Sequence, residues 1–584
     1  MNRLKKILSA LHGKSKSELF QLYNSKYSVC QNESGKRLFI KEKEKIFFFE
    51  GVEFYFESCS NRNSERLILN VVIKSIKQVN NLDKNLLVAV ETYLLWLLYE
   101  PILDLSNLHL NKNKNIREKS QFFIQKPNEN ILKRSGIFYD EQWGGFVLRI
   151  DFRVPLQNAI SINGKGAIKA IKELIHLISE KTTNYNTNEL KRYIDTYRNE
   201  LLIREYLKNK NYQVFVANGS ILPRYSTTST PLANSVPFVS PVSLEEEIEL
   251  ANGEKIKGMI IKSGITIIAG GGYSGKSTLL DSIELGIYNH IPGDGREYVI
   301  TSANSLRTDS EDGRAVYNVN IRPFFNHIPN NSDLSDFTTS HASGSVSQAT
   351  NIIEAINANV DLLLIDEDKS ATNFMIKDRI MREIVSEETI IPFTDRLLEL
   401  KNMKKSIITV IGGSSEYLKY ADTVLLMENY IANDISFLIK KKINEDIISA
   451  PETNWEFSKS LIKEENNKEF LYLNNIEIIN EKNLIIDDCL LNANKLTAIL
   501  NEYQMNSIAL GLENILTNEE EDIDINDLIK KLYITDIRDK VSFIYNGEFK
   551  FFEEIRELDL YNAVNRMTGI KFKKIKGGEI IVKN

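Results

Sequence analysis

Gly270-Gly271-Gly272-Tyr273-Ser274-Gly275-Lys276-Ser277 is a glycine-rich segment of this 584-residue chain, and it ends in lysine and serine. It follows the apolar run Ile265 to Ala269, so we expect a strand before the loop and a helix after it. Glycines allow successive backbone N–H groups to turn inward without interference from a Cβ atom. The N-terminus of the following helix adds partial positive charge at the same place. The sequence therefore predicts a loop that cradles the phosphates of a nucleoside triphosphate.

The end of this loop carries the groups that select a triphosphate. Lys276 is expected to reach the β and γ phosphates, and the Ser277 hydroxyl is expected to ligate Mg²⁺. Thr278 follows and is predicted to be a nucleotide-binding residue like the eight loop residues. The loop also fits the dinucleotide pattern G-x-G-x-x-G, but its Gly-Lys-Ser ending favours a triphosphate. We therefore predict ATP and Mg²⁺ as the cofactors.

Two acids end a second apolar run further along the chain. Leu362 to Ile365 reads as a buried strand, and Asp366 and Glu367 follow it. Because the carboxyl ends of parallel strands meet at one edge of a sheet, both acids are expected beside the phosphate loop. Asp366 would then hold Mg²⁺ together with Ser277, and Glu367 would orient the attacking water as general base. The sequence thus predicts ATP hydrolysis with Glu367 and Lys276 as catalytic residues; the alternative is a strand that merely ends in surface acids.

A serine and a glycine, Ser343 and Gly344, precede a stretch with helical character from Gln348 to Ala358. Such a helix start offers backbone N–H groups to an anion, although a serine that only caps its helix is the simpler alternative. The segment resembles the signature motif of ABC ATPases, which closes on the γ-phosphate bound by the other subunit of a dimer. The resemblance implies a head-to-tail homodimer in which Ser343 and Gly344 are nucleotide-binding residues.

Further segments are similar to the family of predicted ATPases of the ABC class, densely from about residue 215 to 430: Asn218–Arg224, Tyr288–Glu297, Ala342–Ser345, Ile365–Asp368 and Ala371–Met375. The match is thinner at Asp151–Gly166 and Ala563–Arg566. Family membership implies an α/β fold. The resemblance implies an ABC-type P-loop NTPase core with a mostly parallel sheet. It also implies that α+β N-terminal and C-terminal domains flank this core. It also implies association with RNA rather than with transport.

The chain departs from the family pattern in two places. Gly412 and Gly413 stand after the apolar run Ile407–Ile411, where the family has a histidine that senses the γ-phosphate. A glutamine after Thr301 is not evident either, and Glu311–Arg314 is a candidate substitute. The missing histidine keeps open a nucleotide-dependent scaffold with little turnover.

Composition shifts predict the domain boundaries. Four prolines lie between Pro223 and Pro241 among serines and threonines, which indicates a strap between domains. Upstream, apolar and polar residues alternate from Phe146 to Val154, which is typical of a half-buried strand. From about 244, short apolar strands alternate with helices, Val299–Thr301 and Thr423–Met427 among them, as in a mostly parallel sheet. The predicted parts are an N-terminal α/β domain (1–215), a Pro/Ser/Thr-rich strap (216–243), the ABC ATPase core (244–431) and a C-terminal α+β domain (432–584).

Composition also indicates the cellular compartment that we expect for the protein. The chain has three cysteines, Cys30, Cys59 and Cys489, which lie far apart in the sequence. Their number and spacing suggest neither disulfides nor a zinc site, and they favour a reducing, cytoplasmic compartment. The most apolar stretch, Leu86–Tyr99, is interrupted by Glu91 and is shorter than the roughly 20 apolar residues that span a membrane. We therefore expect a buried helix and no membrane insertion.

Two basic clusters suggest what the nucleotide controls. Lysines and arginines neutralise phosphates and exposed aromatic rings stack on bases, although such clusters are often only solvated loops. The residues are Lys112, Lys114, Arg117, Lys119, Lys126, Lys133 and Arg134 with Phe122 and Phe123, and Lys571, Lys573, Lys574 and Lys576 with Phe572. With the family resemblance, they favour an ATP-gated RNA or nucleic-acid clamp. An energiser of a membrane partner is the less favoured alternative.

Overall fold

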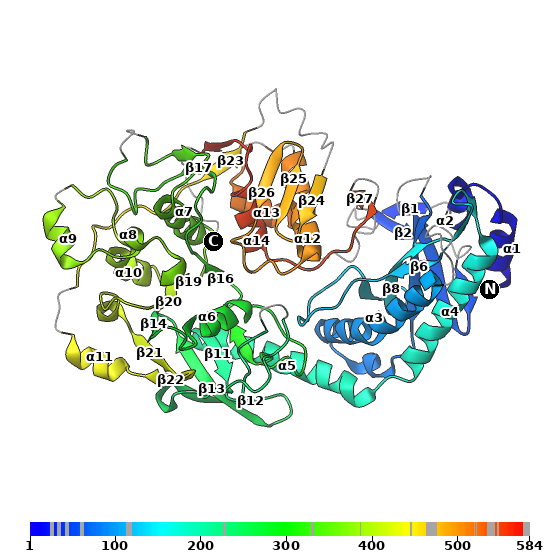
Figure 1. Cartoon of the computed structure of the whole chain (residues 1–584), viewed down its shortest axis with the longest axis horizontal. Coiled ribbons are helices and arrows are strands. Elements are labelled where there is room, and N and C mark those ends of the chain that lie inside the picture. The colour runs from blue at the N-terminus through cyan, green and yellow to red at the C-terminus, as the bar shows by residue number, and fades with distance from the viewer. Residues whose placement is uncertain are drawn as a thin grey trace. The chain divides into compact units, whose positions relative to one another are not determined.

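Helices and strands are assigned in a computed structural model, which describes residues 1–23, 28–31, 37–40, 46–58, 64–111, 119–225, 229–328, 332–385, 387–443, 447–462, 476–518, 520, 522–533, 544–545 and 548–575. The chain divides into two units (Figure 1). Unit 1 is Met1–Ile194 with Thr535–Glu554, and unit 2 is Asp195–Ile534 with Ile555–Asn584. A late segment of the chain therefore belongs to unit 1, and the first boundary lies within helix α5 (Thr187–Lys210). The four-part division expected from composition stays a prediction.

Unit 1 is built on an antiparallel sheet in the order β3-β4-β5-β8-β6, with β7 also paired to β8. Its strands are β3 (Phe47–Phe49), β4 (Val52–Ser58), β5 (Arg66–Ile73), β6 (Gln121–Phe123), β7 (Ile137–Asp140) and β8 (Gly145–Arg153), and its longer helices are α1 (Asn2–Leu11), α3 (Leu87–Asn111) and α4 (Gly164–Thr183). The smaller elements are η1 (Lys16–Leu19), α2 (Phe20–Tyr23), β1 (Ser28–Gln31), β2 (Arg37–Ile40), η3 (Lys77–Asn81), η4 (Lys84–Leu86), β9 (Leu156–Gln157), β10 (Ser161–Ile162), β27 (Ile544–Tyr545) and β28 (Glu548–Phe549).

The strand expected from Phe146 to Val154 forms as β8, but it is not half-buried. Every residue from Gly145 to Phe152 is buried, including the two charged ones. The Arg149 guanidinium lies 4.3 Å from the centre of the Phe138 ring and donates a hydrogen bond to the Ser135 carbonyl oxygen at 2.9 Å. Asp151 forms an ion pair with Arg66. The alternation of apolar and polar residues therefore predicted the strand correctly. Its burial depends on the partners of Arg149 and Asp151, which cover the second face.

Helix α3 contains the most apolar stretch of the chain. Among the described residues, one helical segment, Lys84–Leu108, is long and apolar enough to cross a membrane, and 67% of its most apolar window is buried inside the structure. The core helix of a water-soluble protein passes the same test of length and composition. Burial of the expected segment Leu86–Tyr99 is consistent with a core helix.

Unit 2 contains a mostly parallel sheet in the order β16-β19-β20-β14-β21-β22. The pairs from β16 to β21 are parallel, and only the edge pair of β21 with β22 is antiparallel. The strands are β14 (Ile265–Gly270), β16 (Ser305–Arg307), β19 (Leu362–Asp366), β20 (Ser406–Ile411), β21 (Thr423–Glu428) and β22 (Ile431–Asp434). The expected strands at 265, 362, 407 and 423 all lie in this sheet, as an α/β P-loop fold requires.

Val299–Thr301 forms a strand, β15, but not in the parallel sheet. It belongs to an antiparallel sheet in the order β12-β13-β11-β15, with β11 (Tyr212–Ala217), β12 (Glu245–Glu249) and β13 (Lys255–Lys262). Helix α6 (Lys276–Leu285) buries Leu279 and Ile283 in a core that both sheets share. Leu222 and Phe238 from the proline-rich strap are buried in this core too.

The remaining elements of unit 2 surround these sheets (Figure 1). They are η6 (Val242–Leu244), β17 (Val316–Val319), β18 (Phe337–Thr339), α7 (Gly344–Asn357), η7 (Glu367–Lys369), α8 (Thr372–Met375), α9 (Arg379–Ile384), α10 (Phe393–Asn402), η8 (Leu418–Tyr420), α11 (Ser436–Lys442), β23 (Lys459–Leu461), β24 (Ile476–Asn480), β25 (Asn483–Ile486), β26 (Cys489–Asn492), α12 (Glu502–Thr517), α13 (Ile525–Leu532), α14 (Glu557–Val564) and β29 (Phe572–Lys574).

Candidate nucleotide site

The loop between β14 and α6 has the backbone that its glycines predict. Gly270 (φ 149°) ends the strand and Gly275 (φ 100°) caps the helix, and both angles disfavour a residue with a side chain. A Cβ atom at Gly270 would also lie 2.5 Å from the Met427 carbonyl oxygen. The chain therefore passes from the strand through a tight loop into α6, which begins at Lys276.

The loop leaves room and unused polar atoms for a phosphate chain. A Cβ atom at Gly271 or Gly272 would meet no atom within 4 Å. The Ser274 hydroxyl oxygen is buried and has no hydrogen-bond partner among the described residues. Lys276 is buried as well, and its Nζ donates to the Gly271 carbonyl oxygen at 2.8 Å. These residues fit a triphosphate, because an anion supplies the acceptor that the Ser274 hydroxyl lacks and further acceptors for the Lys276 ammonium.

Strand β19 delivers the two acids to the same sheet edge as this loop. It is separated from β14 only by β20, and all three run parallel. Asp366 is 1% exposed, and its carboxylate accepts from Arg307 at 3.1 Å and from the Asp368 N–H at 3.2 Å. A carboxylate has about four acceptor positions, so two remain. A carboxylate and the Ser277 hydroxyl are oxygen ligands of the kind that Mg²⁺ prefers, and they fit the expected ion.

A buried arginine that no sequence pattern predicts organises the acids. Arg307 lies at the end of β16, beside β19, and it contacts four carboxylates. The distances are 2.7 Å to Asp281, 2.9 Å to Glu284, 2.6 Å to Asp309 and 3.1 Å to Asp366. Strand β16 has three residues, too few for a periodic pattern, and its partners come from three other segments.

The acids and the arginine of this cluster shift one another's pKa values. Burial lowers the pKa of the Arg307 guanidinium, but Asp309 and Glu284 raise it more, so that the pKa lies above its ordinary value. Burial raises the pKa of the Asp309 carboxyl more than Arg307 lowers it. Asp309 also accepts the Asp366 backbone N–H at 3.1 Å, which fixes the end of β19. Arg307 and Asp309 therefore position the proposed metal ligand Asp366.

Glu367 is held by the residue that replaces the expected histidine. The Gly412 backbone N–H donates to the Glu367 Oε2 atom at 2.8 Å. A Cβ atom at Gly412 would find one neighbour within 4 Å among the described residues, the Asp368 Oδ1 atom at 3.8 Å. The end of β20 thus orients the Glu367 carboxylate by its backbone, and space remains beside it.

The signature-like segment forms the start of a helix. Helix α7 begins at Gly344, earlier than the stretch expected from Gln348, and Ser343 is its N-cap without a side-chain capping bond. Gly344 is closely surrounded, since a Cβ atom there would lie 2.7 Å from the Ser310 Oγ atom. Among the described residues, no hydrogen bond joins Ser343 or Gly344 to the phosphate loop. A hollow of about 1060 Å³ lies beside them, and Asp368–Asn373 also line it.

The segment Glu311–Arg314 packs on this helix. Arg314 is buried and pairs with Glu354 of α7. Glu311 pairs with Arg566 at 3.0 Å, and Arg566 also donates to the Asn351 side-chain oxygen at 3.0 Å. Two of the segments that carry the family resemblance, near residues 342 and 566, are therefore joined through a buried polar network.

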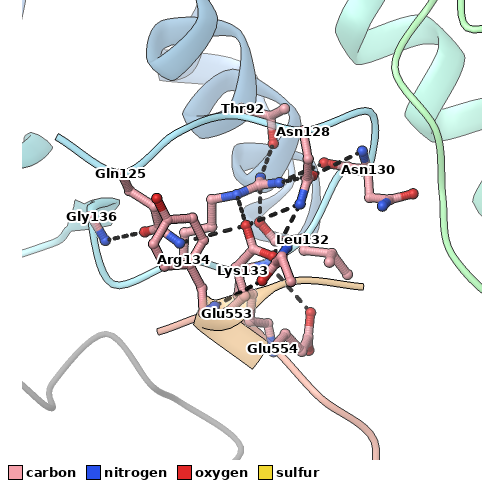
Figure 2. Close-up of polar contacts among 12 residues, drawn as sticks. Thr92, Gln125, Asn128, Asn130, Leu132, Lys133, Arg134, Gly136, Glu553 and Glu554 are labelled. Atoms are coloured by element: carbon pink, nitrogen blue, oxygen red, sulfur yellow. Dashed lines mark hydrogen bonds and ion pairs between the residues drawn. The ribbon is translucent and has the colours of Figure 1, made fainter. Parts of the chain in front are cut away.

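The basic cluster expected near residue 120 is only partly available to a ligand. Lys112, Lys114 and Arg117, like Lys576 of the second cluster, lie outside the described residues. Phe122 and Arg134 are each 1% exposed, so neither side chain is on a surface. Figure 2 shows that Arg134 instead faces Glu553 inside unit 1.

Comparison with known proteins agrees with this geometry. The family model ABC_ATPase, described as a P-loop domain, matches residues 186–461. An uncharacterized protein of Methanocaldococcus jannaschii is 31% identical over 318 residues, which are 47% of this chain and 69% of that protein. This chain belongs to the ABC ATPase family of P-loop proteins. Nucleotide hydrolysis is general in that family, and this ABC-class ATPase has the loop and the acids at one sheet edge.

Solved ATP-binding cassettes resemble parts of this ABC-class ATPase. One is the ADP conformation of a cassette of an ABC transporter, with 16% identity, TM-score 0.23, and coverage of 39% of this chain and 94% of that one. Another is cbiO1 from Clostridium perfringens, part of the transporter complex cbiONQ, with 15% identity, TM-score 0.22, and coverage of 38% and 87%. At these TM-scores neither likeness carries an argument.

Proposed function

We propose that this ABC-class ATPase binds ATP with Mg²⁺ at Gly270–Thr278 and hydrolyses it with Glu367 as general base. One observation carries the proposal: β14 and β19, parallel neighbours of β20, end at the same edge of one sheet. The first strand ends in the phosphate loop and the second in Asp366 and Glu367. Ligands of open α/β sheets bind at this edge.

Each residue has a role that follows from its position. The loop N–H groups, the Ser274 hydroxyl and Lys276 would bind the phosphate oxygens. The Ser277 hydroxyl and the Asp366 carboxylate would hold Mg²⁺, which when bound offsets negative charge on the phosphates. Glu367, oriented by the Gly412 N–H, would accept the proton of the attacking water. Backbone orientation of the base would make the absent histidine dispensable for this step.

We further propose that ATP joins two copies head to tail. Ser343 is exposed at the start of α7 and its side chain caps no N–H group, so it is available to a ligand. The hollow beside it would receive the phosphate loop of the second copy. ATP would then join the copies and hydrolysis would release them.

An RNA-associated clamp in the cytoplasm is the second proposal, and it rests on the family resemblance. Lys571 and Lys574 at β29 are exposed, as a phosphate contact requires. Crosslinked RNA should be recovered from cells carrying Glu367→Gln, and retention should weaken steeply as salt rises. A stable complex with membrane subunits would favour a transport role, and ATP binding without phosphate release would favour a scaffold.

Replacing Lys276 with alanine tests the binding site. Lys276 donates to a backbone carbonyl in the free loop, and it is expected to donate to phosphate oxygens when ATP is bound. Loss of such a charged hydrogen bond should weaken ATP binding roughly 10- to 150-fold. The measurement is titration calorimetry with Mg²⁺ present, and Lys255→Ala, an exposed lysine of the same unit, is the control. Equal affinities for both variants would contradict the proposed site.

A further inference from the structure

A strained turn lies directly beside the phosphate loop. Strands β21 and β22 are joined by the two residues Asn429 and Tyr430, and both have left-handed backbone, with φ of 50° and 68°. Two-residue hairpin turns of this kind favour the pair Asn-Gly, because the second position suits a residue without a Cβ atom. Asn429 follows that preference, whereas Tyr430 stands where glycine is favoured. Residues kept in such strain concentrate at ligand-binding sites.

The turn is fixed to the loop by its backbone and by the tyrosine ring. The Tyr430 N–H donates to the Ser274 carbonyl oxygen at 3.2 Å. A Cβ atom built on Gly275 would lie 3.2 Å from the Tyr430 Cδ1 atom, so an edge of the ring packs against the loop just before Lys276. The rest of the ring is open, since Tyr430 is 57% exposed. A large aromatic side chain is therefore held at the loop with its surface in solvent.

We infer that Tyr430 is the platform on which the base of the nucleotide stacks. A triphosphate seated at Gly270–Ser277 leaves its ribose and base outside the loop, and a base gains affinity by stacking on a fixed aromatic ring. Tyr273, also left-handed at φ 59°, is 100% exposed, so no neighbour orients its ring. Between Ser226 and Gly272 the sequence has one aromatic residue, Phe238, which is buried. Of these three described rings, Tyr430 is the one that is both exposed and fixed at the loop.

This assignment rests on the proposed ATP site, and replacing Tyr430 with glycine separates the two. Glycine keeps the N–H that binds Ser274 and suits the left-handed turn, so the unfolding temperature should stay the same or rise. ATP should bind roughly 5- to 150-fold more weakly, the loss expected for one stacked base. Inorganic tripolyphosphate, which has no base, should bind both proteins equally. Both ligands are titrated with Mg²⁺ present.

Two further variants sharpen the result. Tyr430→Trp keeps an aromatic platform and should bind ATP as tightly as the wild type does. Tyr225→Ala removes another exposed tyrosine of unit 2 and should change neither affinity. Unchanged ATP affinity in Tyr430→Gly, or an equal loss for tripolyphosphate, would overturn the assignment. A wild-type protein that binds neither ligand would overturn the proposed function and this assignment with it.

Discussion

Replacing Glu367 with glutamine should lower ATP turnover by about 10²- to 10⁴-fold and leave ATP affinity nearly unchanged. Glutamine has the size of glutamate, and its side-chain oxygen still accepts the Gly412 N–H that holds the native carboxylate at 2.8 Å. It cannot accept a proton from the attacking water. The site should therefore bind ATP normally and fail at the chemical step, which steady-state phosphate release and calorimetry measure separately.

The same substitution tests the dimer. If Ser343 and Gly344 of one copy close on ATP in the other, blocked hydrolysis should make a dimer accumulate with ATP and Mg²⁺ in size-exclusion chromatography. Glu249→Gln, the same change at an exposed acid of β12, is the matched control and should keep turnover within about threefold of wild type. Turnover by Glu367→Gln close to the control value would remove Glu367 as the base.

The parallel sheet was predictable because its main strands are mostly apolar runs. Strands β14 and β19 are buried along most of their length, and each ends at a recognisable motif. Val299–Thr301 was assigned to the wrong sheet, because a run of only three residues looks alike in either kind of sheet. It pairs with β11, which lies far away in the sequence, so the local pattern does not predict this pairing. The strand β16 is equally short, and it was missed.

The candidate site, like the fold, has one part that the sequence predicts and another part that it does not. The phosphate loop is contiguous in sequence, so its backbone followed from its glycines and its helix start. Arg307 could not be predicted, because its four partners come from three other segments of the chain. The N–H that orients Glu367 belongs to the backbone of Gly412, so the residue type at this position does not predict its role. The catalytic and metal roles of these residues stay predictions.

Replacing Glu553 with alanine should destabilise unit 1 by about 3–5 kcal/mol, because it leaves a buried guanidinium without its counter-charge. Glu553 is fully buried and Arg134 is 1% exposed, with 2.8 Å between the Arg134 Nε atom and the Glu553 Oε1 atom. Arg134 also donates to the Thr92 hydroxyl at 3.2 Å and to the Asn130 carbonyl oxygen at 2.9 Å (Figure 2). Those neutral acceptors cannot replace the carboxylate.

The position of Glu553 in the chain enlarges the expected effect. It lies in the late segment that joins unit 1, and this segment binds there through the backbone too. The Ser135 N–H donates to the Phe552 carbonyl oxygen at 3.1 Å, and the Glu554 N–H donates to the Lys133 carbonyl oxygen at 3.0 Å. Losing the ion pair should therefore loosen this segment, and urea should unfold unit 1 at a lower concentration.

Tryptophan fluorescence in urea measures this change, since Trp96 and Trp143 lie in unit 1 and Trp455 lies in unit 2. Glu141→Ala is the matched control. Glu141 pairs with Lys84 on the surface of unit 1, where water screens the charges, so its midpoint should barely move. Replacing the buried pair together, Arg134→Met with Glu553→Leu, should cost less than Glu553→Ala, because no uncompensated charge remains. If Glu553→Ala shifted the midpoint no more than Glu141→Ala does, the ion pair would not hold the late segment in unit 1.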